Sequence, residues 1–452
     1  MNRGLTLSLN PRLVAFLVLK ETAAGRHPEE TLAEQGQLLP QRDQNLAAAL
    51  TYETLRHQSF LDWVLQSRLT IGRTGSNLRL VLRLGLTQLL YFDRLKEHAA
   101  VSETVALAKD LLPGRAGLVN AVLRSLLRTR AAGHPWPPKP TLSGNPAKDL
   151  ALNHSYPSWL VLNLLHRFTP NETEEILVAG NRPTPPTLRL SPGPVDRETF
   201  SRTLPFDTRP TLFSPWGLTA LKFAGRPENW PGFAEGRFTV QDEASQLLGL
   251  LTGSLAPGSK VLDACCGLGG KTLLLAALNP TALIIARDKD PTKLERLQVE
   301  AGRLGLTNIQ TERGDSLAER PENTATYDLV LVDAPCSGLG VIRRRPDLKW
   351  NKSTTDLSRL AALQFTLLTA ASRTVKPGGR LIYGVCSFSE AEGPEVAKKF
   401  HSNRPDFRPA PTEAWPESLR PHLGPGPSLT LWPHRHQTDG FFWAIWHRLS
   451  PA

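Results

Sequence analysis

Two cysteines stand directly after apolar runs that have the character of β-strands. Cys336 follows the run Leu329–Asp333, and Cys386 follows the run Arg380–Val385. The carboxyl ends of strands in an open α/β sheet are where ligands and reacting groups collect. A lone cysteine is more often a small, inert, buried residue. Two thiols at equivalent positions, one of them accompanied by the carboxylate of Asp333, need a further explanation.

A glycine-rich turn precedes them in the run Val261–Thr272, after a predicted strand and before a predicted helix. Glycine permits a tight turn and close approach of a ligand, while a helix N-terminus offers unpaired N–H groups. The phosphate-binding pattern GxxxxGK[ST] is not met, because Cys265 stands five residues before Gly270. The turn alone is therefore ambiguous.

Acidic residues at successive strand ends resolve the ambiguity. Asp288, Asp315 and Asp333 each follow a predicted strand, and an acid after the second strand can accept hydrogen bonds from ribose hydroxyls. This layout is typical of S-adenosylmethionine-dependent methyltransferases. The predicted cofactor-binding residues are Cys265, Cys266, Gly267, Leu268, Gly269, Gly270, Lys271, Asp288, Asp315 and Asp333.

The C-terminal part, residues 237–452, alternates strands and helices and predicts an α/β, Rossmann-like domain with a mainly parallel sheet. We expect strands at Lys260–Leu262, Ala282–Ala286, Ile309–Glu312, Leu329–Val332 and Arg380–Tyr383. We expect helices at Pro291–Leu304 and Leu357–Val375, the second closed by Lys376–Gly379.

Residues 1–131 show apolar positions at helical spacing and predict an all-α bundle. Residues 132–236 begin with a proline-rich connector and predict a small α+β module, with a strand near Pro186–Leu190. The formal charge of the whole chain is +11. Residues 1–150 hold 19 Lys and Arg against 12 Asp and Glu, so this part supplies +7. A polyanionic partner is the expectation.

The four cysteines lie after residue 260 and show neither zinc-site spacing nor a disulfide framework. This pattern suits a reducing cytosol and predicts a cytoplasmic protein without a metal. The apolar run Leu13–Leu19 follows Asn10 and Pro11, which favour a helix start over a signal peptide. No stretch reaches the roughly 18 apolar residues of a membrane span, and we expect a monomer.

Three runs of the N-terminal part, Arg83–Tyr91, Val101–Ala108 and Gly117–Arg124, resemble the RNA-binding helical domain of the NusB antitermination factor family. The resemblance implies contact with RNA. The alternative is a helical scaffold that binds a protein. The basic charge of this part favours RNA.

The C-terminal part resembles the RNA cytosine-C5 methyltransferases of the Nol1/Nop2/Sun family. The matching runs are Val240–Ser245, Asp333–Ser337, Gly340–Asp347, Val385–Ser387 and Asp439–Phe442. Together with the NusB-like start, the whole chain is similar to the bacterial members that act on 16S (small-subunit) rRNA. The resemblance therefore implies methylation of cytosine C5 in that RNA, with S-adenosylmethionine as cofactor.

The residues alone leave open which thiol is the nucleophile, because Cys336 and Cys386 both follow strands. The resemblance implies that Cys386 attacks cytosine C6, that Cys336 assists product release, and that Asp333 stabilises charge in the ring. It also implies RNA-binding roles for a further set of side chains. These are Arg343, Arg344, Phe441 and Phe442.

Two motifs depart from the family pattern. The glycine loop carries Cys266, Gly267 and Leu268 where Ala-Ala-Pro is usual, and Val385 stands where a threonine is usual. Losing the proline is expected to loosen the loop. Two alternative functions remain at this point, a tRNA cytosine-C5 methyltransferase and a catalytically idle RNA-binding assembly factor. The intact thiols and acids count against the idle factor.

Overall fold

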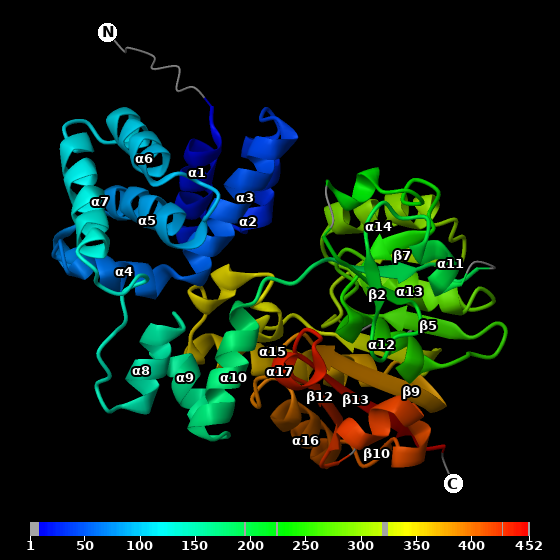
Figure 1. Ribbon diagram of the computed structural model, residues 1–452. Helices are drawn as coiled ribbons and strands as arrows, with labels where there is room; N and C mark the ends of the chain where they lie inside the picture. Colours follow the sequence, from blue (N-terminus) through cyan, green and yellow to red (C-terminus); the bar gives the residue numbers. More distant parts are fainter. Residues whose placement is uncertain (1–8, 194–195, 223–224, 319–323, 427, 451–452) are drawn as a thin grey trace. The chain divides into compact units, whose positions relative to one another are not determined.

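The computed structural model describes residues 9–193, 196–222, 225–318, 324–426 and 428–450. Contacts divide the chain into two compact units. Unit 1 consists of Met1–Arg182 with Arg344–Asn351, and unit 2 consists of Pro183–Arg343 with Lys352–Ala452. Helices build the first unit and two β-sheets organise the second (Figure 1).

The helical bundle predicted for the N-terminal part is confirmed in unit 1. The helices are α1 (Pro11–Ala23), α2 (Pro28–Gly36), α3 (Gln41–Arg56), α4 (Gln58–Gln66), α5 (Ser76–Tyr91), α6 (Glu97–Leu111), α7 (Ala116–Ala131), α8 (Pro146–Asn153), α9 (Ser158–Leu165) and α10 (Pro170–Asn181). The Asn10 side chain caps α1 by accepting from the N–H groups of Arg12 and Leu13.

Apolar faces of α1 and α3 to α7 form the main core of unit 1. Gly85 of α5 allows close approach of α6 and α7, since a Cβ there would lie 2.8 Å from a methyl of Leu123 and 2.9 Å from a methyl of Thr104. Arg83 and Asp62 form a two-point ion pair between α5 and α4, at 2.7 and 2.5 Å.

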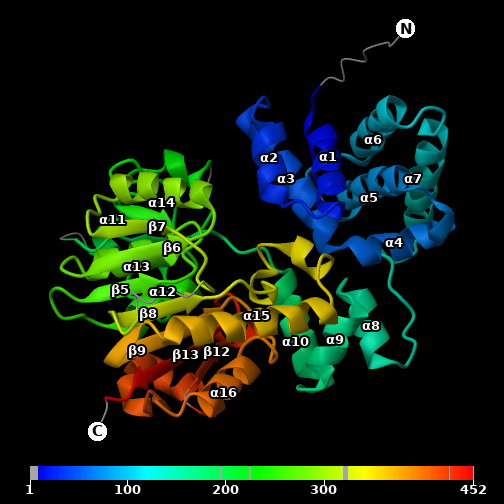
Figure 2. The same cartoon turned by 180° about the vertical axis from the view of Figure 1, so that it is seen from behind.

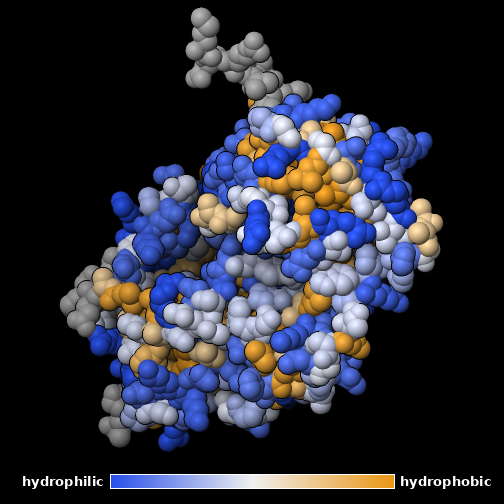
Figure 3. All heavy atoms as spheres, turned by 90° about the vertical axis from the view of Figure 1, so that its left-hand side faces the viewer, coloured by the Kyte–Doolittle hydropathy of each residue, from blue (hydrophilic) through white to orange (hydrophobic). Residues whose placement is uncertain are grey.

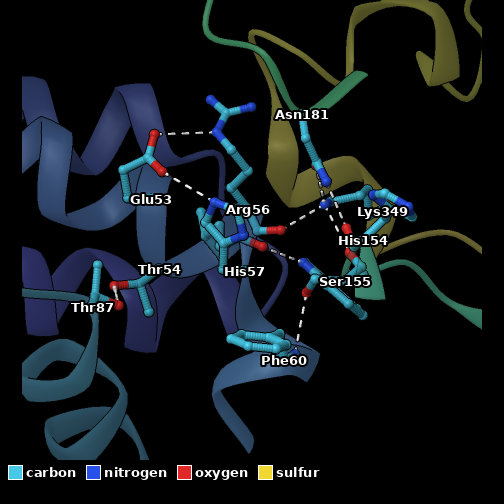
Figure 4. A network of polar contacts seen from close by, with 12 residues as sticks. Glu53, Thr54, Arg56, His57, Phe60, Thr87, His154, Ser155, Asn181 and Lys349 are labelled. Atoms are coloured by element: carbon cyan, nitrogen blue, oxygen red, sulfur yellow. Dashed lines mark hydrogen bonds and ion pairs between the residues drawn. The ribbon is translucent and has the colours of Figure 1, made fainter. Parts of the chain in front are cut away.

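The segment Arg344–Asn351 folds with the helices, although the residues on either side of it belong to unit 2. The Lys349 ammonium donates to the backbone oxygens of Arg56 and Ser155, at 2.7 and 2.9 Å, and to Asn181 Oδ1 at 3.0 Å (Figure 4). Trp350 Nε1 donates to Leu55 O at 2.6 Å. The periodicity of the sequence does not indicate that Arg344–Asn351 folds with unit 1 while the residues on either side of it fold with unit 2.

A small antiparallel sheet opens unit 2, with strand order β2-β3-β1-β4. Its strands are β1 (Thr187–Leu190), β2 (Thr208–Pro210), β3 (Gly217–Ala220) and β4 (Phe238–Val240), and the short helix α11 (Arg197–Ser201) lies between β1 and β2 in the chain. The strand predicted near Pro186–Leu190 is confirmed. The range 132–236, predicted as one connector and module, is divided, because its helices up to Asn181 belong to unit 1 and its strands to unit 2.

The large sheet of unit 2 has the order β11-β12-β13-β9-β8-β5-β6-β7, with β10 paired to β13. Its strands are β5 (Lys260–Asp263), β6 (Leu283–Asp288), β7 (Ile309–Arg313), β8 (Tyr327–Asp333), β9 (Val375–Val385), β10 (Phe407–Pro409), β11 (Leu423–Gly424), β12 (Ser428–Leu431) and β13 (Phe441–Arg448). Strands β5 to β9 pair in parallel, as the alternating pattern predicted, and β13 is antiparallel to β9.

Helices cover both faces of this sheet (Figures 1 and 2). They are α12 (Glu243–Thr252), α13 (Gly270–Leu278), α14 (Pro291–Arg303), α15 (Thr354–Ser372), α16 (Pro394–Asn403) and the short α17 (Pro433–His436). Helices α12 and α13 pack with one set of strand side chains, including Val261, while α15 and α16 pack with the alternate set, including Leu262. The sheet is therefore buried on both faces, as parallel sheets usually are.

One boundary prediction was wrong. Lys376–Gly379 was expected to close a helix, but α15 ends at Ser372 and these residues lie within β9. The register jumps from the pair Tyr327 and Val375 to the pair Leu329 and Arg380. The chain bulges there, and Gly378 has a φ of +76° that glycine adopts readily.

Candidate active site

The structure brings the two predicted thiols together at one edge of the sheet. Asp333 at the end of β8 pairs with Gly384 near the end of β9, so the loops that follow start side by side. Cys336 Sγ lies 3.2 Å from Cys386 Sγ. Neither cysteine forms a disulfide, and both are partly buried. Parallel register therefore places both sulfurs within reach of a single substrate atom.

The two thiols are not equivalent. The hydrogen bond with Cys386 and burial raise the pKa of the Cys336 thiol well above its usual range, and the charges of Glu392 and Asp333 add to the shift. A thiol with a raised pKa keeps its proton. Either sulfur can donate the hydrogen bond that joins the two thiols.

Asp333 is held by Lys271, the residue that follows the glycine turn. Lys271 Nζ lies 2.6 Å from Asp333 Oδ2. Burial lowers the pKa of Lys271, but the Asp333 carboxylate more than offsets this effect and the pKa lies above its usual value. The ring of Phe441 faces the ammonium, with its centroid 4.9 Å from Nζ. Lys271 thus fixes the acid beside the thiols.

Backbone contacts hold the Cys386 loop against two other motifs. Gly340 N–H donates to Cys386 O at 3.0 Å, and Gly440 N–H donates to Gly340 O at 2.8 Å. A Cβ on Gly340 would lie 1.9 Å from the carbonyl oxygen of Gly440. Only glycine fits at position 340, which explains why the loop after Cys336 can lie this close to the loop after Cys386.

The glycine turn and the acid after β6 form the predicted cofactor edge. Gly267 N–H donates to Asp288 Oδ2 at 3.0 Å, and Gly267 and Gly269 have φ values of +56° and +86°. Nothing lies within 4 Å of a Cβ built on Gly267. The space above the turn and the carboxylate beside it fit a nucleoside with ribose hydroxyls.

Asp263, at the end of β5, lies just before the glycine turn in the chain. Its carboxyl is completely buried, Oδ2 accepts from Thr272 Oγ1 at 2.7 Å, and Oδ1 has no partner. Burial raises the pKa of this carboxyl to about 7, against the opposing effect of the Thr272 hydrogen bond. An orphaned buried polar atom under a glycine turn is consistent with a polar ligand at this edge.

The remaining predicted cofactor residues differ in placement. Cys265 is partly buried and Cys266 is buried, and burial raises the pKa of both thiols, so they do not suit nucleophilic roles. Leu268 is 58% exposed at the tip of the turn. Asp315 is exposed, and its Oδ1 accepts from Leu317 N–H at 2.9 Å. Their cofactor-binding roles stay predictions.

The residues predicted to bind RNA are mostly internal. Arg343 is buried and forms ion pairs with Asp439 and, at 3.3 Å, with Asp242. Phe441 and Phe442 are 1% exposed and belong to the cores on opposite faces of the sheet. Arg344 is partly buried and belongs to unit 1. Their RNA contacts stay predictions without support from this placement.

Sequence reasoning missed Asp263 and Glu392. Glu392 is buried in the loop after Cys386 and bonds to the serine that follows each cysteine. Asp263 ends a strand just before the glycine turn, and that position could have marked it. Glu392 lies in a loop, six residues after Cys386, and no local pattern identified it.

Within the described ranges, the helices are all too short or too polar to cross a membrane. The fold and the site together define a class of protein. A parallel sheet with a glycine turn, strand-end acids and paired thiols is a methyltransferase fold that uses S-adenosylmethionine.

Comparison with known proteins narrows the class. The family described as "16S rRNA methyltransferase RsmB/F" matches residues 252–447, and the NusB family matches residues 9–128. "Probable ribosomal RNA small subunit methyltransferase B" of Synechocystis is 32% identical over 96% of this chain and 98% of the relative. "Ribosomal RNA small subunit methyltransferase B" of Pseudomonas putida is 34% identical over the same shares.

Solved structures agree on the fold. The crystal structure of PH0851 covers 98% of this chain and 100% of its own, with a TM-score of 0.79 at 24% identity. NSun6 from Pyrococcus horikoshii with SFG covers 66% of this chain and 99% of its own, with a TM-score of 0.56 at 18% identity. The chain belongs to the ribosomal RNA small subunit methyltransferase B family.

Proposed function

We propose that this protein methylates cytosine C5 in 16S (small-subunit) rRNA through a covalent thiol adduct. The observation that carries the proposal is the pair of sulfurs 3.2 Å apart, next to the acid held by Lys271. Cytosine C5 is too weak a nucleophile to take a methyl group unaided. A thiolate that adds to C6 makes the ring enamine-like and activates C5. The names of the Synechocystis and Pseudomonas relatives support the rRNA substrate.

Cys386 is the proposed nucleophile. The hydrogen bond with Cys386 and burial raise the pKa of the Cys336 thiol. The thiolate is the attacking species, so a thiol with a raised pKa is a poor nucleophile. The raised pKa of Cys336 and the family resemblance thus favour the same assignment.

The proposed bond changes take place at C6 and C5 of the cytosine ring. The Cys386 Sγ–C6 bond forms and shifts an electron pair toward N3, where a proton delivered through Asp333 neutralises the charge. S-adenosylmethionine, when bound, supplies a methyl group carried on a positively charged sulfur. C5 gains the methyl group and loses its proton to a base, and the Sγ–C6 bond then breaks with its electron pair returning to sulfur. Cys336 assists this release.

Gly267, Asp288 and the buried carboxyl of Asp263 are the groups proposed to hold the cofactor. Gly267 exposes an open backbone face, Asp288 offers a carboxylate to ribose hydroxyls, and Asp263 supports the turn from below through Thr272. The exposed Leu268 replaces the usual proline of the loop and leaves cofactor binding possible with a looser turn.

The helical part is proposed to capture the RNA. A hollow of about 550 Å³ at the start of α5 has Arg73 and Arg115 among its lining residues, next to leucines such as Leu78 and Leu112. Figure 3 shows one face of the molecule, on which hydrophobic side chains form a large patch and several smaller ones among mostly hydrophilic side chains. Arginines beside apolar surface suit contact with phosphates and unstacked bases.

We also propose the division of labour along the chain: residues 1–131 bind RNA, residues 132–236 connect, and residues 237–452 catalyse. The protein is proposed to act in the cytoplasm, where four free thiols stay reduced, and as a monomer. No step of the proposed chemistry is assigned to a metal.

The test is transfer of labelled methyl groups from S-adenosylmethionine to naked 16S rRNA, followed by bisulfite mapping of the product. Label at one or more cytosines is the expected result. Label on tRNA alone would assign the chain to the tRNA alternative. No label on either RNA, with intact RNA binding, would favour the idle assembly factor.

A further inference from the structure

Glu392 is a completely buried carboxylate in the loop after Cys386. Its Oε2 accepts from the hydroxyl of Ser337 and, at 2.7 Å, from the hydroxyl of Ser387. Its Oε1 accepts from Ser337 N–H at 2.6 Å. Ser337 is the residue after Cys336, and Ser387 is the residue after Cys386. One carboxylate therefore ties together the two turns that carry the sulfurs.

The acceptor capacity of this carboxylate is filled. Gln364 Nε2 donates to Oε1 at 3.1 Å, which brings the donors on the two oxygens to four with the three above. A carboxylate offers about four acceptor positions. The two partners of Oε1 are N–H groups that can only donate. The two partners of Oε2 are hydroxyls, so an amide at this position would keep its contacts only if both serine hydroxyls turned round to accept from the NH₂ group.

The surroundings fix Glu392 in turn. Tyr383 OH donates to the backbone oxygen of Glu392 at 2.5 Å, and Gln364 Nε2 also donates to Pro335 O at 3.0 Å. Gly393 packs directly on Phe442, since a Cβ there would lie 2.8 Å from the ring. This packing gives Phe442 a structural role in the thiol site.

We propose that Glu392 is a positioning residue that sets the distance and orientation of Cys386 and Cys336. It does so by holding Ser387 and Ser337 on one carboxylate. The inference rests on the proposed function, because the two sulfurs act in sequence on one cytosine there. Ser387 then governs adduct formation through Cys386, and Ser337 governs release through Cys336.

The main test is Glu392→Gln, which keeps the size of the side chain and replaces acceptor positions with donors. We expect kcat for RNA methylation to fall about 100-fold, the cost of a displacement of about 1 Å in a reacting group. The KM for RNA and the affinity for S-adenosylmethionine should stay within about twofold, because Glu392 is completely buried and both its oxygens are occupied by protein donors. Glu395→Gln, an exposed carboxylate on α16, is the matched control and should leave kcat unchanged.

The two serines separate positioning from a general loss of structure. Ser387→Ala should slow adduct formation, whereas Ser337→Ala should slow release and let the RNA adduct accumulate. Equal effects of both variants on both steps would contradict the assignment. Wild-type kcat in Glu392→Gln would overturn it.

A readout without RNA keeps this test independent of the proposed function. Diamide, an azo oxidant, removes two electrons and two protons from Cys336 and Cys386, joins them as a disulfide and becomes the hydrazine. Peptide mapping of the full chain measures the rate. Glu392→Gln should slow this disulfide at least about tenfold if the sulfurs move apart, and an unchanged rate would overturn the inference. A wild-type protein that forms the disulfide but methylates no RNA would reject the proposed function alone.

Discussion

Lys271 in unit 2 and Lys349 in unit 1 are both removed from water, but their partners differ. Lys271 has 12% of its side chain exposed and lies 2.6 Å from a carboxylate. Lys349 is completely buried and meets neutral oxygens on three separate segments. Burial lowers the pKa of each, yet Asp333 brings the pKa of Lys271 above its usual value, while the charge of Arg56 lowers the pKa of Lys349 further.

The difference shows what each lysine does for its unit. Lys271 is one half of an ion pair with Asp333, the acid proposed to act with the two thiols, so its charge is assigned to the proposed chemistry. Lys349 uses the donors of its ammonium to join the end of α3, the turn after α8 and the end of α10 to the segment Arg344–Asn351. Its ring contact with Tyr156, 4.1 Å from Nζ to the centroid, offsets part of the cost of burial.

The largest effect is expected from Lys271→Met. This variant leaves Asp333 without its cation, so methylation should fall about 10²- to 10³-fold, as when one preorganised electrostatic partner is removed. Lys271→Arg should recover part of the loss because it keeps the charge. Single-turnover methyl transfer measures both. Lys398→Met, at an exposed position of α16, is the control, and methylation by Lys271→Met at the control rate would show that the ion pair is not needed.

A stability effect is expected from Lys349→Met. The variant leaves three buried acceptors without a donor, at about 1–3 kcal/mol each, but it also removes a buried charge whose desolvation is costly. The net loss for unit 1 should be about 2–4 kcal/mol. Urea unfolding followed at the tryptophans measures it, with the exposed Lys109→Met as control. A free energy of unfolding equal to that of the control would contradict the proposal that Lys349 joins Arg344–Asn351 to the helices.

The smallest effect is the pH dependence of that loss. The folded pKa of Lys349 lies well below 10.5, the value expected in the unfolded chain. Between the two values the unfolded chain binds more protons, so this group makes the free energy of unfolding rise with pH, by at most about 1.4 kcal/mol per pH unit. The gap between wild type and Lys349→Met should therefore widen from pH 7.5 to pH 10. A gap that narrows over this range would contradict the assigned shift.

Lys271 predicts the opposite sign. Its folded pKa is raised, so its contribution to stability is complete below the ordinary lysine pKa and is lost only as the pH rises through the folded value. The two lysines should thus differ in the alkaline range. As the pH rises, the contribution of Lys349 to the free energy of unfolding should grow first, and the contribution of Lys271 should fall at higher pH.

Local signals in the sequence were enough for much of the catalytic edge. The strand before Asp263, the glycine turn and the run that ends in Asp333 each carry their own pattern, and parallel pairing brings them together. The predicted strands at Lys260, Ile309 and Leu329 are confirmed. The proximity of Cys336 and Cys386 followed from the rule that strand ends share one edge.

Features that depend on distant partners escaped prediction. Arg343 was expected to bind RNA, but it is buried and pairs with Asp439 and Asp242, which lie far away in the sequence. Phe441 and Phe442 were expected to meet RNA, yet β13 is covered on both faces, so adjacent side chains both lie in cores. Lys349 could not be assigned to the helices, because nothing near it in the sequence indicates that Arg344–Asn351 belongs to unit 1. The boundaries at 131 and 236 stay predictions.

The central claim is that Cys386 bonds to cytosine while Cys336 ends the cycle. Cys336→Ala and Cys386→Ala should each be incubated with 16S rRNA and S-adenosylmethionine and then run on a denaturing gel. A covalent protein–RNA band with Cys336→Ala and none with Cys386→Ala is the predicted result. A band with Cys386→Ala alone would reverse the two roles, and no band with either variant, where wild type methylates the RNA, would contradict the covalent mechanism.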